Sequence, residues 1–464
     1  MIDELRALLG PDRVLTGAET APWARDWTGQ YEGQPLAVAR PGSTEEVAGV
    51  MRLAARAGCP VTAVSGGTGL VGGGITEGGL ILSLDRMRRI GPVNRAARTV
   101  EVEAGVVLQD LHAAAEAEGL IFPMTFGAKG SARIGGMIAT NAGGSNVLRY
   151  GSMRRLVLGL EAVMADGRVL TLMSGLHKDN TGLDLRQLLI GSEGTLGIVT
   201  RATLSLAPKP AAYATATVGV PSMEAGLTLL RRLQDASGGQ VEAFEFMPDI
   251  YIDRHVAHGG TPPFAERHPV VLLVELGATA ARDTVPDAEG RVPLDRLLEE
   301  ELAGAFEAEL VSDAVLAASE AQRREMWARR EAAAEITFTG EPVVDTDVAL
   351  PLDRLQEFFD RVRPAVAALD PEATDLAVGH LGDGNIHYTV FPSRSEREHA
   401  AALRAAVDDT AAALGGSFSA EHGIGRSKLE TLRRLKDPAA QEAMRAVKAA
   451  LDPAGLLNPG RTIP

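Results

Sequence analysis

The chain has 464 residues, too long for one average domain, which predicts two or three domains with sizeable cores. Its formal net charge of −15 argues against non-specific nucleic-acid binding, because such binding requires a basic face. Its single cysteine, Cys59, excludes an internal disulfide, and no apolar run approaches the roughly 18 residues of a membrane-spanning helix. The N-terminal residues are acidic and helical in pattern, unlike a signal peptide, so we expect a cytoplasmic protein and leave peripheral membrane contact open.

The predicted secondary structure differs between the first 210 residues and the rest of the chain. The first part alternates glycine-rich loops with short apolar segments, and we predict a helix over 44–57 and strands over 61–64, 80–84, 99–102, 105–108, 156–164, 169–172 and 198–206. From about residue 211 longer elements take over, with strands over 214–220, 270–276, 375–380 and 386–391 and helical patterns over 223–235, 294–310, 396–414 and 427–451. This second pattern predicts an α+β domain with helices on one face of an antiparallel sheet.

Three clusters of small residues adjoin strands in the first part, namely VSGGTGLVGGG (64–74), SARIGGMIATNAGGSNV (131–147) and IGSEGTLG (190–197). The first contains a formal GxGxxG match at 67–72, the spacing of a nicotinamide dinucleotide fingerprint. That fingerprint requires a helix to begin within the glycines, and the run of glycines up to residue 79 does not favour one. A loop whose amide groups form a nest for a pyrophosphate explains the clusters better. A flexible surface loop would explain any one cluster alone equally well.

Two histidines and a neighbouring Glu-His pair form a second pattern. His380 and His387 flank a Gly-Asp-Gly-Asn turn, so a hairpin would place them on neighbouring strands. Glu421 and His422 precede two glycines, and in an extended segment their side chains point to opposite sides. Two histidines with one carboxylate form a ligand set for a catalytic divalent metal, whereas a hydrogen-bonded pair of core histidines is the alternative, and spacing alone leaves both open.

The motifs together carry a family resemblance. The three clusters, KDNTGLDL, HLGDGNIH and SAEHGIG resemble the FAD-linked D-2-hydroxy-acid dehydrogenases, which include D-lactate dehydrogenase, a glycolate oxidase and D-2-hydroxyglutarate dehydrogenase. The resemblance implies an α+β fold, in which a two-subdomain FAD-binding domain of the p-cresol methylhydroxylase (PCMH) type is followed by an α+β substrate domain with an antiparallel sheet. We predict an FAD-binding domain over 1–209, a substrate domain over 210–418, and a C-terminal segment over 419–464 that returns to the FAD domain with active-site residues.

The same resemblance assigns the cofactor residues. The first loop has Thr68 and no histidine, so non-covalent FAD is expected, since members with covalent flavin have a histidine there. The pyrophosphate would be held by Ser65, Gly66, Gly67, Thr68, Gly69 and Gly73. The flavin would be lined by Ser131, Gly135, Gly136, Thr140, Asn141, Gly143, Gly144, Gly194 and Ile198, and Asn458 completes the cofactor set.

The resemblance also implies roles in catalysis. His380, His387 and Glu421 would bind Zn²⁺ or a similar divalent ion, His422 would be the general base, and Arg330 would hold the substrate carboxylate. The implied reaction oxidises a D-2-hydroxy acid to the 2-oxo acid, with hydride passing to flavin N5 and electrons leaving to a quinone, an electron-transfer flavoprotein or a cytochrome. A homodimer is compatible with the sequence.

Two positions depart from the D-2-hydroxyglutarate pattern, since Asp345 stands where a lysine and Ala334 where a threonine is expected. An acidic Asp345 would repel a second substrate carboxylate, which favours a D-lactate-like monocarboxylate. The alternatives are a D-2-hydroxyglutarate or glycolate dehydrogenase, a different flavin oxidase or ether-lipid synthase on the same fold, and a non-catalytic subunit.

Overall fold

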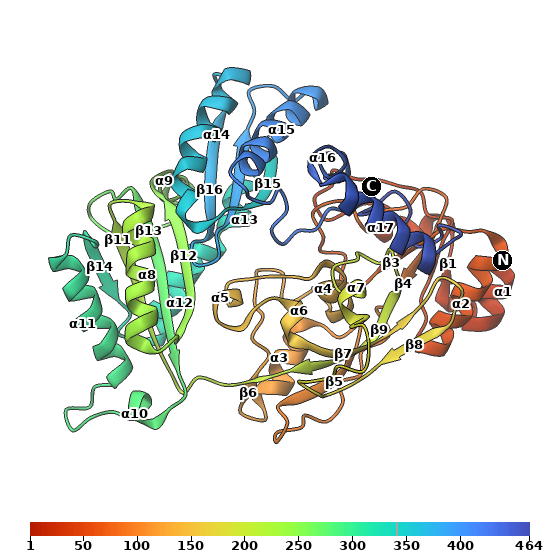
Figure 1. Cartoon of the computed structure of the whole chain (residues 1–464), viewed down its shortest axis with the longest axis horizontal. Coiled ribbons are helices and arrows are strands. Elements are labelled where there is room, and N and C mark those ends of the chain that lie inside the picture. Colours follow the sequence, from red (N-terminus) through yellow and green to blue (C-terminus); the bar gives the residue numbers. More distant parts are fainter. Residues whose placement is uncertain (340–341) are drawn as a thin grey trace. The chain divides into compact units, whose positions relative to one another are not determined.

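The computed structural model describes residues 1–339 and 342–464 and divides the chain into two compact units. The glycine-loop unit comprises residues 1–144, 150–209 and 421–464, and the sheet unit comprises residues 145–149 and 210–420. The last segment of the chain thus belongs to the same unit as the first, and Asn458 N donates to Val61 O over 2.8 Å. Figure 1 shows both units, with the chain coloured from red at the N-terminus to blue at the C-terminus.

The glycine-loop unit contains two four-stranded sheets with separate apolar cores. In the first sheet, ordered β1-β2-β4-β3, the last three strands are parallel, and α1 and α2 pack against them. The second, ordered β5-β9-β7-β8, is antiparallel and packs against α3 and α4. The strands are β1 (Val14–Leu15), β2 (Ala37–Ala39), β3 (Val61–Val64), β4 (Leu80–Ser83), β5 (Thr99–Glu103), β6 (Leu120–Ile121), β7 (Val157–Val163), β8 (Val169–Leu172), β9 (Ile198–Ser205) and β10 (Ala207–Pro208). The helices are α1 (Ile2–Leu9), α2 (Thr44–Ala57), α3 (Leu108–Glu116), α4 (Ile134–Thr140), α6 (Met153–Leu156), α7 (Arg186–Leu189), α16 (Leu429–Leu435) and α17 (Pro438–Leu451), while α5 (Val147–Tyr150) crosses the boundary between the units.

Local chemistry explains where these elements begin and end. Helix α2 begins as expected, because Ser43 Oγ accepts from Glu46 N, and it ends at Gly58 in the left-handed conformation. The predicted strand over 105–108 is wrong: Val106 N donates to Glu103 O over 3.1 Å, which makes a turn, and α3 follows from Leu108. The helical pattern over 427–451 is divided into α16 and α17, since Asp437 caps a new helix that begins at Pro438.

The sheet unit is built on one seven-stranded antiparallel sheet, ordered β14-β11-β13-β12-β16-β17-β15. Its strands are β11 (Ala212–Val220), β12 (Val241–Pro248), β13 (Val270–Ala278), β14 (Asp313–Leu316), β15 (Val344–Ala349), β16 (Thr374–His380) and β17 (Asn385–Phe391). Its helices are α8 (Met223–Ser237), α9 (Asp249–Ala257), α10 (Ala281–Thr284), α11 (Pro293–Glu307), α12 (Glu320–Glu331), α13 (Ala333–Thr337), α14 (Leu355–Leu369) and α15 (Arg397–Ala413).

Helices cover both faces of this sheet (Figure 1), whereas one covered face was predicted. One face packs its largest apolar core against α8, α11, α14 and α15. The other face carries Met247, Leu273 and Leu376, which pack against α9, α12 and α13. Because these second-face side chains are also apolar, burying them requires the additional helices. Among the described residues, no helix is long and apolar enough to cross a membrane.

Candidate functional site

The first two glycine clusters lie against each other in the glycine-loop unit. A Cβ atom added to Gly66 would lie 2.7 Å from Ser131 O, and one added to Gly136 would lie 3.4 Å from Ser65 Cβ. Ser65 Oγ also donates to Ala104 O over 3.0 Å, which fixes the start of the first loop. The absence of side chains on these glycines therefore allows two backbone segments to approach within direct contact.

The third cluster docks on the second and is tied to the C-terminal segment. Glu193 N donates to Ala139 O over 2.8 Å, at the end of α4. Asn458 Nδ2 donates both to Gly73 O (3.1 Å) and to Glu193 O (2.9 Å), so one side chain joins the first loop to the third. The three clusters, which are far apart in the sequence, thus converge on one region of this unit.

The remaining predicted cofactor residues differ in their contacts within the protein. Thr140 Oγ1 donates to Gly136 O within α4, and Asn141 ends that helix at φ 51°, where its Oδ1 accepts from Arg154 N. Ile198 is buried in the apolar core, so only its backbone can face a ligand. Gly143 lies against Glu421, since an added Cβ would be 2.5 Å from Glu421 Oε2.

Open space borders part of the first loop. Atoms added as Cβ to Gly67 or Gly69 would meet nothing within 4 Å, so open space borders the loop there. Gly67 has φ +67°, the left-handed conformation that glycine adopts without strain. The loop therefore leaves room for a ligand such as the pyrophosphate of FAD beside Gly67 and Gly69. Gly73, Gly135, Gly144 and Gly194 belong to the same three clusters.

A buried carboxylate fixes the segment that follows His422. Glu193 Oε1 accepts from Ile424 N and Oε2 accepts from Gly425 N, each over 2.8 Å. Burial raises the pKa of Glu193, and the two N–H donors oppose this rise. The loop that carries Glu421 and His422 is therefore anchored at its C-terminal side within the glycine-loop unit.

In the sheet unit, the two motif histidines lie on adjacent strands, as predicted. His380 ends β16 and His387 lies on β17, and their ring centroids are 5.7 Å apart. Gly384 adopts φ +80° in the turn between them, which a side chain would strain. The two histidines offer ring nitrogens within 4.8 Å of each other, so they form a candidate ligand pair for one metal ion.

The interacting pair of Arg330 and Glu245 lies beside His380. Glu245 Oε2 accepts from Arg330 Nε and Glu245 Oε1 from His380 Nδ1, both over 2.8 Å, and the Glu245 side chain is 0% exposed. Burial would raise the pKa of Glu245, but the adjacent His380 and Arg330 outweigh it and hold that pKa below its usual value. Tyr251 Oη donates to Arg329 O (2.8 Å) and Arg330 O (3.2 Å), which fixes the end of α12.

A second buried carboxylate, Asp347 on β15, lies on the other side of the histidine hairpin. Its Oδ1 accepts from Asn385 Nδ2 (2.9 Å) and its Oδ2 accepts from Ala420 N (3.0 Å). Ala420 is the last residue of the sheet unit, and Glu421 and His422 follow it directly in the chain. Asp347 therefore fixes Ala420 at the end of the sheet unit.

Sequence reasoning missed Glu193, Glu245 and Asp347 as functional-site residues. Glu245 lies in the apolar strand VEAFEFMP, where a charge at an inward-facing position could have served as a signal. Asp347 pairs with His387 in the strand register and alternates with buried Val344 and Val348. Glu193 offered no such signal, because it lies in a loop.

Asp345 lies on the same sheet face as His387. Asp345 pairs with Thr389 in the register between β15 and β17, two residues from His387, and Thr389 Oγ1 donates to Asp345 Oδ1 over 3.0 Å. The strand therefore directs this carboxylate toward the face that carries the two histidines.

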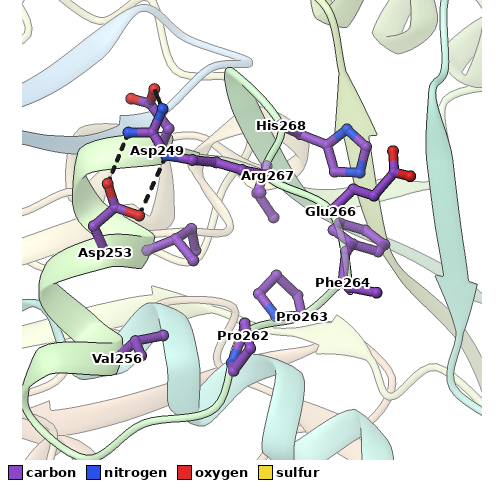
Figure 2. A pocket seen from close by; sticks show the side chains of 12 residues that line it. Asp249, Asp253, Val256, Pro262, Pro263, Phe264, Glu266, Arg267 and His268 are labelled. Carbon is purple, nitrogen blue, oxygen red and sulfur yellow. Dashed lines mark hydrogen bonds and ion pairs between the residues drawn. The ribbon is translucent and has the colours of Figure 1, made fainter.

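A separate hollow of about 310 Å³ lies between α9 and the segment 262–268 of the sheet unit (Figure 2). Arg267 bridges Asp249 Oδ2 (2.8 Å) and Asp253 Oδ2 (2.7 Å) at its edge, so these charges are paired. None of the predicted site residues lines this hollow.

Comparison with known proteins shows the family of this chain. Residues 35–173 match the family described as "FAD binding domain", and residues 209–462 match "FAD linked oxidases, C-terminal domain". The mitochondrial D-2-hydroxyglutarate dehydrogenase of Bos taurus is 39% identical, covering 100% of this chain and 84% of the relative. D-2-hydroxyglutarate dehydrogenase of Xanthomonas citri pv. viticola is 37% identical over 96% of this chain and 92% of the relative.

Solved structures show the same fold at low sequence identity. A substrate-bound p-cresol methylhydroxylase superposes with a TM-score of 0.77 at 16% identity, over 99% of this chain and 96% of that one. An alkyldihydroxyacetonephosphate synthase gives 0.73 at 16% identity, over 99% and 85%. The chain therefore belongs to the FAD-linked oxidases with a PCMH-type FAD-binding domain, and within them to the FAD-linked D-2-hydroxy-acid dehydrogenases. The family and fold class predicted from the sequence are confirmed, and FAD is the cofactor.

Proposed function

We propose that this enzyme oxidises D-2-hydroxyglutarate or a closely related D-2-hydroxy dicarboxylate to the 2-oxo acid. The names of the relatives favour this substrate over the D-lactate-like acid that Asp345 and Ala334 suggested from the sequence. The observation that carries the proposal is that Glu245, His380 and His387 share one sheet face, where Glu245 binds Arg330 of α12. This arrangement combines a cation for a carboxylate with nitrogen ligands for a metal ion.

Each residue has a proposed task. Arg330 binds the substrate carboxylate with its Nη groups, while its Nε is held by Glu245. His380, His387 and Glu421 would hold Zn²⁺ or a similar ion, and His422 would accept the proton of the substrate hydroxyl. An ion at that position would lower the pKa of this hydroxyl. FAD, when bound, supplies the acceptor for the hydride that leaves the α-carbon.

A second substrate class is favoured by the position of Asp345. Its carboxylate lies on the same face as His387 and would repel a distal carboxylate, which would leave a D-lactate-like monocarboxylate as the better substrate. The kcat/KM values for D-2-hydroxyglutarate and D-lactate, measured with an artificial electron acceptor, decide between the two. A higher value for D-lactate would overturn the main proposal.

The assignment of His422 as base has a direct test. The variant His422→Ala should keep its yellow FAD but lose anaerobic bleaching by substrate. Alanine cannot accept the proton that the substrate hydroxyl must lose before hydride transfer. Rate loss is expected at about 10²–10⁴-fold. Bleaching at the wild-type rate would refute the assigned base, and activity unaffected by exhaustive chelation would refute the metal.

Several further features remain proposals. We propose non-covalent FAD and a quinone, an electron-transfer flavoprotein or a cytochrome as electron acceptor. A homodimer and a cytoplasmic location are likewise proposed. The functional boundaries at 1–209, 210–418 and 419–464 are also proposed, with the last segment bringing active-site residues to the FAD domain.

A further inference from the structure

We propose that Glu245 is a positioning residue that holds the substrate-binding arginine and a metal-binding histidine in one rigid unit. The inference rests on the proposed function, because it takes the roles of Arg330 and His380 from it. It adds a residue that no sequence motif identified and explains how the carboxylate anchor and the metal ligand keep their separation.

The geometry of the contact is specific. Glu245 on β12 lies directly opposite His380 on β16 in the strand register, and its side chain is 0% exposed. One carboxylate oxygen accepts from His380 Nδ1 and the other accepts from Arg330 Nε, each over 2.8 Å. Each oxygen of the Glu245 carboxylate therefore accepts from one of the two side chains, so a single group holds both His380 and Arg330.

The contact also fixes the tautomer of the histidine. An ionised carboxylate can only accept hydrogen bonds, so Nδ1 of His380 carries the proton. In the neutral ring the lone pair is then on Nε2, the atom that a metal ion would use. Carboxylates that orient metal-binding histidines in this way strengthen metal binding by about 10–100-fold.

The second histidine also has a carboxylate nearby, at a longer distance. His387 Nδ1 lies 3.9 Å from Asp347 Oδ1, beyond hydrogen-bond distance, whereas His380 Nδ1 lies 2.8 Å from Glu245. Asp347 accepts from Asn385 Nδ2 and from the backbone of Ala420. The close carboxylate–histidine contact and the contact to the substrate-binding arginine thus coincide in Glu245.

The chain offers a matched control on the same sheet and the same helix. Glu275 on β13 accepts from Arg323 Nε and Nη2, each over 2.7 Å, and its side chain is 4% exposed. Arg323 and Arg330 both lie on α12, so both pairs join this helix to the sheet. Among the residues that the structure describes, Glu275 also accepts hydrogen bonds from Trp327 and Thr215, and none of these partners is a histidine. A substitution of Glu275 should therefore remove a comparable buried ion pair and leave the proposed site unchanged.

The experiment compares Glu245→Gln with Glu275→Gln in the full-length FAD-loaded protein. After removal of bound metal, Co²⁺ is titrated in competition with a chelator, and thermal unfolding and FAD content are recorded. In Glu245→Gln the amide can donate to His380 Nδ1 and shift the proton to Nε2. Co²⁺ affinity should therefore fall by about 10–100-fold. In Glu275→Gln the affinity should stay within about threefold of wild type, with a similar change in Tm.

Steady-state kinetics supply a second measurement. Because Arg330 loses its orienting partner, KM for the hydroxy acid should rise more in Glu245→Gln than kcat falls, and Glu275→Gln should show neither change. If Glu245→Gln does not fold, Glu245→Asp keeps the charge but is too short to reach both partners. It should show the same loss of Co²⁺ affinity.

The outcomes separate this inference from the proposed function. A wild-type protein that binds no Co²⁺ and oxidises no D-2-hydroxy acid would overturn both. A wild-type protein that does both, with Co²⁺ affinity and KM equal in Glu245→Gln and Glu275→Gln, would overturn the role of Glu245 alone.

Discussion

In the glycine-loop unit the proposed ligand contacts come mainly from backbone, whereas in the sheet unit they come from side chains on neighbouring strands. Gly66 and Gly136 let two loops touch directly, and Asn458 joins the first loop to the third. In the sheet unit Glu245 and His380 face each other across the register of β12 and β16. The difference indicates that cofactor binding should be sensitive to added volume and catalysis to lost charge and hydrogen bonds.

The largest effect is expected from adding one methyl group to the first loop. In Gly66→Ala the new Cβ would lie 2.7 Å from Ser131 O and 3.0 Å from Arg133 N, both backbone atoms that cannot rotate away. We expect a loss of about 1–3 kcal/mol in unfolding free energy together with loss of bound FAD, and hence of all activity. Flavin absorbance per mole of protein measures the bound FAD, and denaturant unfolding measures the free energy of unfolding.

A control for this variant is Gly119→Ala. Gly119 has φ +71° and open space around it, so the substitution should cost about 1–2 kcal/mol through backbone strain alone. FAD content should then stay at the wild-type level. Equal FAD content in both variants would contradict the idea that backbone approach between the clusters is required for the cofactor.

A smaller effect is expected from changing the cation in the sheet unit. Arg330→Lys keeps the charge but loses the planar fork that can bind Glu245 and a substrate carboxylate together. We expect kcat/KM to fall by about 10–100-fold with FAD still bound, as for the loss of a hydrogen bond to a charged group. Arg323→Lys, on the same helix and paired with Glu275, should leave kcat/KM unchanged. Loss of FAD in Arg330→Lys would contradict the idea that cofactor binding depends on the glycine-loop unit and catalysis on the side chains of the sheet unit.

The smallest effect concerns substrate choice. Asp345→Asn removes the negative charge on the histidine face and should raise the ratio of kcat/KM for D-2-hydroxyglutarate over D-lactate by up to about fivefold. Asp375→Asn is the control, because Asp375 lies on the opposite face of the sheet and pairs with Arg363. An unchanged ratio in Asp345→Asn would show that this carboxylate does not select the substrate.

The sequence alone determined the features that depend on local chemistry. The three glycine clusters, the hairpin that brings His380 and His387 onto adjacent strands, and most strands could be predicted, because turns and alternating patterns are encoded by neighbouring residues. The errors arose where local pattern was ambiguous, as in 105–108, where a short apolar run forms a turn before α3.

The tertiary structure decided which distant groups meet. Glu245 reaches Arg330 across 85 residues and His380 across 135, and Glu193 reaches Ile424 across 231. No local pattern encodes such pairs, because they depend on the strand order β12-β16-β17-β15 and on the return of the C-terminal segment to β3. The sequence thus supplied the motif residues, while the folded chain supplied the buried carboxylates that orient them, since a buried charge is stable only where the fold brings its partners.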